Sequence, residues 1–240
     1  MIQKLDILVL SAHPDDAELC CSGTVAAMVA AGKKVGFVDF TQGELGTRGT
    51  AELRLQEAEA SARVLGLSVR DNLGMRDGFF KVDEEHILQL VAKIRQYQPD
   101  IVLANAVDDR HPDHGRAAQL VKEAFFLSGL RRVETRLEGT LQQEWRPRQL
   151  FHYIQSNYIQ PDVVVDITDH WETKMASIRA FGSQFHDPNS KEPETFISSD
   201  RFMKFIESRA REWGQSIGVT YGEGFTVSKQ IGVKSLSDLL

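Results

Sequence analysis

The sequence has few of the features that mark secreted, membrane-spanning or nucleic-acid-binding proteins. Its only cysteines are the adjacent Cys20 and Cys21, which cannot bridge each other without strain, so a disulfide scaffold is excluded. No apolar run approaches the ~18 residues of a membrane helix, and the run around Ile7 to Leu10 follows Asp6. The 28 basic residues, against 34 acidic ones, form no dense stripe to neutralise a phosphate backbone. We therefore predict a protein of the reducing cytoplasm, without a signal peptide, that binds neither nucleic acid nor a membrane.

What the sequence does contain is enough apolar material for a large core. Of its 240 residues, 42% are hydrophobic, which is close to the average for globular proteins. At ~150 residues per domain this length is compatible with one large domain. No linker, internal repeat or low-complexity segment divides the chain. We predict a single domain over residues 1–240.

Short β-branched runs alternate with longer helical patterns along most of the chain. This alternation predicts right-handed βαβ crossovers and a mostly parallel sheet covered on both faces. The fold class is therefore α/β, a Rossmann-like three-layer sandwich. The charged stretch 131–148 is predicted to be a loop, and the glycine-punctuated tail from Tyr221 fits no pattern clearly. The predicted strands are 6–10, 35–40, 69–73, 101–104, 149–153 and 163–167, and the predicted helices are 17–31, 51–65, 84–98, 114–129, 170–181 and 200–215.

Two His-Pro-Asp turns fall just beyond the carboxyl ends of predicted strands, where ligands bind in open parallel sheets. Each proline restricts the residue before it, so both turns are stiff. If the first and fourth strands are neighbours, the two turns face one crevice. The first turn is His13-Pro14-Asp15-Asp16-Ala17-Glu18 and the second is Asp108-Asp109-Arg110-His111-Pro112-Asp113-His114.

These turns supply the ligands that a borderline divalent ion such as zinc accepts. Three protein ligands with one open position mark a catalytic site, and we predict His13, Asp16 and His114 as that set. Asp15 cannot readily share the ion with its neighbour, which leaves it as the general base for a bound water. One such turn alone is more often a helix-capping loop. With two turns, the metal-site and capping interpretations are about equally good.

The paired motif resembles that of the PIG-L/LmbE-like zinc deacetylases, and the resemblance covers about residues 7–225. Within that family, the segment Gly43 to Thr50 followed by Glu52-Leu53-Arg54 resembles a bacterial branch. That branch deacetylates N-acetylglucosaminyl-malate in bacillithiol biosynthesis. The resemblance implies hydrolysis of the N-acetyl group of an N-acetylglucosamine conjugate, with this malate conjugate as the first choice, releasing acetate and a free amine. It also implies a homo-oligomer, often a hexamer in the family.

The resemblance implies roles for individual residues as well. It places zinc on the same three ligands and makes Asp15 the base. It adds His111, protonated and oriented by Asp113, as the electrophile that faces the oxyanion. One fixed donor of this kind contributes on the order of ~2.7–4 kcal/mol. Iron(II) or cobalt(II) would accept the same ligands as zinc.

Two arginines are weaker candidates for binding the substrate. Arg54 matches a substrate-contacting arginine of the family. It lies near the start of its predicted helix, where an unpaired cation is disfavoured, so it should have an anionic partner. A surface ion pair with Glu52 or Glu57 is an equal alternative. Arg110 is expected either to grip the malate carboxylate or to hold one of the two aspartates before it.

Two further candidates and the cysteines have less specific signals. Arg48, in a glycine-flanked segment, is a substrate-binding candidate if that segment is a mobile lid, although a simple turn is the preferred interpretation. Gln184 resembles a recurring position of the bacterial branch, and spacing assigns it no role. Cys20 and Cys21 are expected to pack as small buried hydrophobes rather than to bind metal.

Three other functions compete with this hypothesis. Asp39 ends a predicted strand where a dinucleotide-binding protein has its ribose-binding acid. However, the turn from Ser11 to Glu18 has no glycine, and its aspartates would repel a pyrophosphate. A non-catalytic sugar- or metal-binding module remains possible, and acetate release would separate enzyme from binder. Inside the family, a chito-oligosaccharide, an inositol-linked glucosamine or a thiol S-conjugate would use the same metal chemistry.

Overall fold

The computed structural model describes residues 4–185 and 191–239, and a seven-stranded sheet lies at its centre. The strands of this sheet are β1 (Ile7–Ser11), β2 (Val35–Asp39), β3 (Val69–Asn72), β4 (Ile101–Ala104), β7 (Gln149–Tyr153), β8 (Val163–Asp166) and β9 (Gly222–Val227). The helices are α1 (Asp16–Ala30), α2 (Ala51–Leu65), α3 (Glu84–Tyr97), α4 (Pro112–Leu127), α5 (Trp171–Arg179) and α6 (Asp200–Ser216), with the short 3-10 segments η1 (Thr168–His170) and η2 (Leu236–Leu239).

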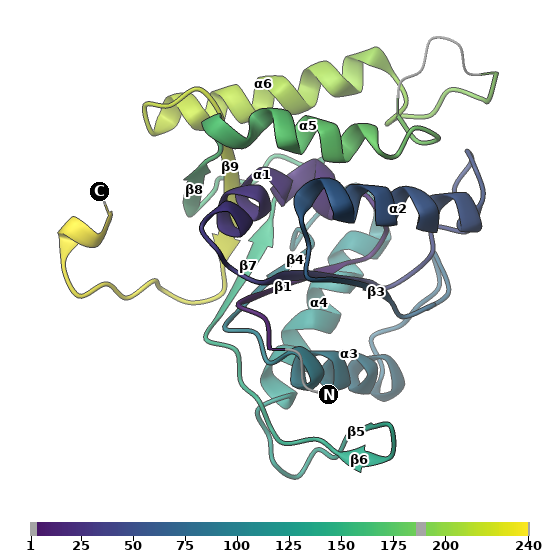
Figure 1. Ribbon diagram of the computed structural model, residues 1–240, viewed down its shortest axis with the longest axis vertical. Coiled ribbons are helices and arrows are strands. Elements are labelled where there is room, and N and C mark those ends of the chain that lie inside the picture. The colour runs from purple at the N-terminus through teal and green to yellow at the C-terminus, as the bar shows by residue number, and fades with distance from the viewer. Residues whose placement is uncertain (1–3, 186–190, 240) are drawn as a thin grey trace.

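The sheet is covered by helices on both faces. Helices α3 and α4 lie on one face and α1 and α2 on the other; α5 packs on the outside of α1 and α2, and α6 packs against β9 (Figure 1). The strand order is β3-β2-β1-β4-β7-β9-β8, and the first five strands in that order are parallel. The prediction of an α/β sandwich with a mostly parallel sheet is confirmed.

Local sequence explains why the elements begin and end where they do. All five residues of β1 are buried, which is typical of a parallel strand covered on both faces. Helix α2 begins after Thr50, whose side chain accepts a hydrogen bond from the Leu53 N–H, and it ends at Gly66 with φ of 68°. These capping signals stand in the sequence, and the predicted helix 51–65 matches α2.

The tail that fitted no pattern forms strand β9, which pairs antiparallel with both β7 and β8. Its glycines obscure the strand because they serve packing against α6. A Cβ on Gly222 would lie 2.9 Å from the Gly214 nitrogen, and one on Gly224 would lie 3.1 Å from the Trp213 ring. The stretch 131–148 is also not entirely a loop, since it contains the hairpin strands β5 (Arg136–Leu137) and β6 (Thr140–Leu141).

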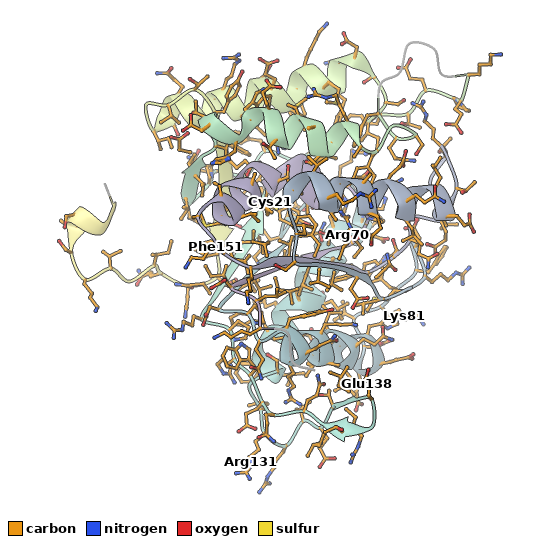
Figure 2. All side chains as sticks on the ribbon, viewed as in Figure 1. Cys21, Arg70, Lys81, Arg131, Glu138 and Phe151 are labelled. Carbon is orange, nitrogen blue, oxygen red and sulfur yellow. The ribbon has the colours of Figure 1, made fainter. Side chains whose placement is uncertain are left out.

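The cysteines behave as expected. Cys20 and Cys21 are buried and form no disulfide, and Cys21 lies on the inner side of α1 (Figure 2). Burial raises the pKa of the Cys20 thiol to about 12, so it carries no charge at neutral pH. No helix among the described residues is long and apolar enough to cross a membrane.

Candidate metal centre and active site

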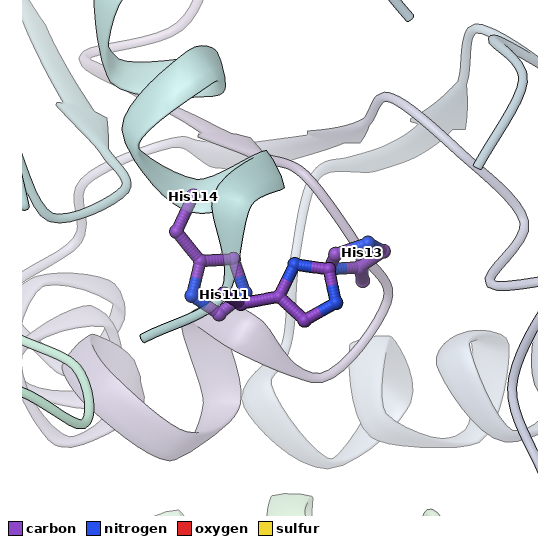
Figure 3. A group of neighbouring side chains, drawn as sticks. All are labelled: His13, His111 and His114. Carbon is purple, nitrogen blue, oxygen red and sulfur yellow. The ribbon is translucent and has the colours of Figure 1, made fainter. Parts of the chain in front are cut away.

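The two His-Pro-Asp turns meet because the strands before them are neighbours. Strand β1 pairs in parallel with β4, Leu10 opposite Ala104, and with β2 on its other side. The strand order reverses at this point, which is where open α/β sheets bind ligands. The rings of His13, His111 and His114 gather beside the N-terminal end of α4 (Figure 3). One ring nitrogen from each of these histidines lies within 4.8 Å of the others.

The Asp16 carboxylate lies between two of these rings. Its Oδ2 is 3.4 Å from Nδ1 of His13, and its Oδ1 is 3.1 Å from Nε2 of His114. The other nitrogen of each ring faces a carboxylate: His13 Nε2 is 3.0 Å from Asp77 Oδ1, and His114 Nδ1 is 2.6 Å from Asp109 Oδ2. Acids in these positions hold the ring N–H and leave the opposite nitrogen free for a metal. The donor set therefore fits a divalent cation held by His13, Asp16 and His114.

Two amides fix the orientation of the Asp16 carboxylate. Asn105 Nδ2 donates to Asp16 Oδ2 at 3.0 Å, and Gln155 Nε2 donates to Asp16 Oδ1 at 3.1 Å. The His13 backbone N–H also donates to Oδ2, at 3.0 Å. Sequence reasoning did not identify Asn105, Gln155 or Asp77. Asn105 directly follows β4, so its position at the strand end was the available signal. Gln155 and Asp77 follow strands too, but at distances that carry no motif.

The surrounding acids favour the protonated, positively charged form of the His13 and His114 rings. Burial alone would lower the pKa of His114, but the charge of Asp16 and hydrogen bonds to Asp109 and Asp16 raise it to about 9. Hydrogen bonds from His114 and the backbone oppose the effect of burial on Asp109 and lower its pKa to about 2. A site that binds a proton this tightly also attracts a metal ion, and metal binding there would release the proton.

Asp15 has a different environment from its neighbour Asp16. It lies at the N-terminus of α1 with φ of 112°, a strained conformation for a residue with a side chain. Arg54 holds it there, since Nη2 donates to Asp15 Oδ2 at 2.8 Å and Nε donates to the Pro14 carbonyl at 3.0 Å. Burial raises the pKa of Asp15 to about 7, although the Arg54 charge opposes the shift. A carboxyl group of this pKa is suited to exchange protons near neutrality.

Arg54 thus has the anionic partner that its position predicted, but that partner is Asp15. The alternative of a surface ion pair with Glu52 or Glu57 is wrong, because Arg54 is buried. Glu57 instead accepts hydrogen bonds from the backbone and hydroxyl of Ser183, both at 2.7 Å. Arg54 lines the cavity while it holds the predicted base.

The geometry of His111 agrees with orientation by Asp113 but differs from the expectation of a protonated ring. His111 is the N-cap of α4, and its Nδ1 accepts a hydrogen bond from the Asp113 backbone N–H at 3.2 Å. A ring that accepts at Nδ1 is neutral and carries its proton on Nε2. Burial, with the positive charges of His13 and His114, also lowers the pKa of His111. His111 can therefore donate from Nε2, but as a neutral imidazole.

The Asp113 carboxylate has other partners. It accepts a hydrogen bond from the Gly78 N–H at 2.8 Å and from Arg116 at 2.6 Å, and it lies 3.4 Å from His13 Nε2. Asp113 therefore orients His111 through its backbone, while its side chain faces a predicted metal ligand. In the contacts that the described residues make, the side chain does not reach the His111 ring nitrogens, so the orienting contact is the backbone N–H of Asp113.

A cavity of about 620 Å³ opens over this cluster, within the size range of small-molecule sites. Arg110 lines the cavity and lies 4.3 Å from the centre of the Phe196 ring. The expected alternative, an ion pair with Asp108 or Asp109, is wrong, because those acids accept hydrogen bonds from Asn157 and His114. No carboxylate of the described residues lies within ion-pair distance of Arg110.

The other two substrate-binding candidates connect two loops. Gln184 lines the cavity, and its amide donates to the Arg48 carbonyl at 2.8 Å. Arg48 is buried, with Nε 3.4 Å from Glu192 Oε2, and it does not line the cavity. The prediction that Arg48 contacts substrate is therefore not supported by its position. Through these contacts, Gln184 and Arg48 connect the loop before α2 to the segment after α5.

The dinucleotide alternative also fails on geometry. The Asp39 carboxylate is buried and accepts hydrogen bonds from Arg70, at 2.9 Å from Nε and 3.2 Å from Nη2. It is therefore engaged inside the protein rather than free to hold a ribose hydroxyl.

Fold and site together define an α/β protein with a His/Asp cluster that could hold a metal ion at the switch point of its sheet. The family described as GlcNAc-PI de-N-acetylase, PIG-L, matches residues 8–125. The whole fold is similar to the crystal structure of a conserved protein from Thermus thermophilus, with 34% identity and a TM-score of 0.86, over 97% of this chain and 98% of that one. The chain belongs to the PIG-L family.

Relatives of known activity include more than one reaction. The chain is 28% identical to diacetylchitobiose deacetylase of Thermococcus kodakarensis, over 91% of this chain and 81% of that protein. It is 24% identical to a probable N-acetyl-alpha-D-glucosaminyl L-malate deacetylase of Bacillus anthracis, over 77% and 84%. It is also 27% identical to 4-oxalmesaconate hydratase of Pseudomonas putida, over 75% and 74%. Because deacetylases and a hydratase share this fold, the reaction has to be argued from the site.

Proposed function

We propose that this protein is a zinc-dependent deacetylase that removes the acetyl group from an N-acetylglucosamine conjugate. N-acetylglucosaminyl-malate, as in bacillithiol biosynthesis, is the substrate that the Gly43 to Arg54 segment favours. Of the three relatives named above whose names state a reaction, two are deacetylases of N-acetylglucosamine compounds, which supports the reaction class. The product pair is acetate and the free glucosamine amine.

One observation carries the proposal: two adjacent aspartates have opposite environments. Asp16 faces two histidine nitrogens and is fixed by amides, whereas Asp15 is buried, bound by Arg54 and has its pKa raised to about 7. Pairs of acids whose surroundings separate their pKa values mark a division of roles in catalysis. Here Asp16 is a metal ligand and Asp15 is the proton carrier.

The residues divide the reaction between them. A divalent cation bound by His13, Asp16 and His114 would polarise the amide carbonyl and lower the pKa of a water toward ~7. Asp15 accepts the proton of the attacking water. The neutral His111 ring donates a hydrogen bond from its Nε2–H to the carbonyl oxygen of the acetyl group, which gains negative charge when water attacks. Asp15 then returns the proton to the departing amine, so that acetate and the amine leave.

Acetate release is the direct test. Protein purified without added metal should contain a substoichiometric divalent ion, lose acetate release on chelation and regain it with zinc, iron(II) or cobalt(II). A panel of N-acetylglucosaminyl-malate, diacetylchitobiose and an inositol-linked N-acetylglucosamine ranks the substrates by kcat/KM. Binding of these compounds without acetate release would identify a binding module, and hydration of 4-oxalmesaconate in its place would identify a hydratase. Either outcome would overturn the proposal.

Size-exclusion chromatography tests the homo-oligomer that the family resemblance implies.

The pH profile tests the assignment of Asp15. Only the deprotonated base accepts a proton, so kcat/KM should rise with pH through the pKa of Asp15. The midpoint of this rise should lie at or below pH 7, because the bound metal cation favours the charged carboxylate. Arg54→Gln removes the cation that opposes the raised pKa, so the rising limb should move to higher pH by roughly 1–3 units. Arg63→Gln, an exposed position on the same helix, is the matched control. An unchanged limb in Arg54→Gln would assign the titration to another group.

A further inference from the structure

One cation in the cavity wall lacks an acidic partner. Arg209 on α6 lines the cavity although only 7% of its surface is exposed. Its Nη1 donates to the Gln155 carbonyl, and its guanidinium lies 4.9 Å from the Phe205 ring centre and 5.1 Å from the Trp213 ring centre. Among residues 4–185 and 191–239, no carboxylate lies within ion-pair distance of this guanidinium.

Other buried cations of the fold are compensated. Lys174 Nζ lies 2.7 Å from Glu223 Oε1, Arg70 Nε lies 2.9 Å from Asp39 Oδ2, and Arg54 pairs with Asp15. Arg95 has no acid, but its guanidinium donates to the carbonyls of 128, 130 and 133 and to the Thr135 hydroxyl. Among the described residues, Arg209 has no acid within ion-pair distance, and the one carbonyl that it contacts is that of Gln155.

An uncompensated buried charge is unfavourable, so it indicates a ligand that supplies the opposite charge. Removal from water lowers the pKa of Arg209, and the Cys20 side chain and the charges of Glu223 and Asp109 oppose this shift only in part. A guanidinium presents N–H groups in a fork that matches the two oxygens of a carboxylate or a phosphate. Packing against Phe205 and Trp213 holds the fork in place, so little side-chain freedom would be lost on binding.

Arg209 lies near the predicted metal ligands, where the acetamide group would react. Cys20 lies one helical turn after Asp16, and residues so spaced are roughly 5–6 Å apart. Gln155 contacts Arg209 through its carbonyl and Asp16 through its side chain. Arg110 lines the same cavity at its exposed rim and also has no acidic partner among the described residues. Two unpaired arginines therefore face one cavity, one close to the metal ligands and one at the mouth.

We propose that Arg209, together with Arg110, binds an anionic group on the part of the substrate that is not acetylated. This inference rests on the proposed deacetylase function and deepens it. The substrate class is an N-acetylglucosamine conjugate that carries a carboxylate or a phosphate, rather than a neutral oligosaccharide. Arg209 is the specificity-determining residue, because its buried guanidinium contributes most when an anion enters and is left uncompensated when a neutral group enters.

The test compares anionic with neutral substrates. Arg209→Gln keeps a donor for the Gln155 carbonyl but removes the charge. It should lower kcat/KM for N-acetylglucosaminyl-malate by roughly 10- to 100-fold, as expected for lost hydrogen bonds to a charged group. The loss for methyl N-acetylglucosaminide should be at least 10-fold smaller. Replacing malate by a phosphate ester in the same assay tells which anion is preferred, and Arg209→Lys should recover part of the selectivity.

The control is Arg211→Gln, two residues along the same helix. Arg211 is exposed and bonds to Glu207 and Tyr221, and it does not line the cavity. It should leave the ratio between the two substrates unchanged. If Arg209→Gln lowers both substrates equally, Arg209 only braces Gln155 and the inference is overturned.

A binding measurement separates this inference from the deacetylase proposal. Calorimetric titration of the metal-loaded protein with free L-malate or with inorganic phosphate needs no turnover. Binding of either anion that weakens about 10-fold or more in Arg209→Gln supports the anion site even if no acetate is released from any substrate. Acetate release without preference for anionic substrates, and without anion binding, would leave the deacetylase proposal standing and overturn this one.

Discussion

Asp15→Asn should lower kcat by roughly 10²–10⁴-fold while the protein keeps its metal. The amide is close in size to the carboxyl group, and it can still accept the Arg54 hydrogen bond that holds Asp15. It cannot accept a proton from water or return one to the amine. Asp16, which faces both ligand histidines, is unchanged by the substitution. Acetate release under saturating substrate and metal content per chain are the two measurements.

Glu52→Gln is the control for Asp15→Asn, because Glu52 is an exposed acid in the first turn of the helix that carries Arg54. It should leave both kcat and metal content unchanged. Thermal melting of the two variants separates loss of chemistry from loss of folding. If Asp15→Asn keeps its metal and turns over at nearly the normal rate, the base is another group.

The sequence predicted that the histidines of the candidate metal site would come together because one topological rule brings their turns side by side. His13 and His114 come from turns after β1 and β4, and the parallel pairing of these strands makes the turns neighbours. The hydrophobic pattern of the sequence shows the alternation of strands and helices from which this pairing follows. The rule has no information about residues outside a motif, and this is why Gln155 and Asp77 were missed. Strand β9 was missed because glycines needed for packing against α6 interrupt its apolar pattern.

The chemical state of a side chain was harder to predict than its position. His111 is where the motif places it, but whether its ring is charged depends on the backbone N–H that caps it. Arg54 needed an anionic partner, and several acids nearby in the sequence qualified. In the folded protein the partner of Arg54 is Asp15, which is 39 residues away along the chain. Such choices depend on three-dimensional contacts between segments, so spacing along the chain cannot decide them.

Asp16→Ala should weaken metal binding by roughly 10²–10³-fold and abolish acetate release at ordinary metal concentrations. Structural zinc sites with four protein ligands bind with ~10–16 kcal/mol, so one ligand contributes about 2.5–4 kcal/mol on average. Asp109→Asn should have a smaller effect, about 10–100-fold, because it removes only the acid that orients His114. Competition with a chelating indicator measures both affinities, and both should increase with pH as the histidines lose their protons.

His111→Ala distinguishes this ligand set from a second one that the geometry allows. Because the ring nitrogens of His13, His111 and His114 lie within 4.8 Å of one another, three histidines could hold the ion without Asp16. His111, however, accepts the Asp113 N–H at Nδ1 and so carries its proton on Nε2. We therefore expect His111→Ala to retain metal affinity within about threefold and to lose kcat by roughly 10²–10³-fold, the effect of one missing oxyanion donor. Loss of metal in His111→Ala together with retention in Asp16→Ala would assign the ion to the three histidines. It would also require a new role for the adjacent aspartates.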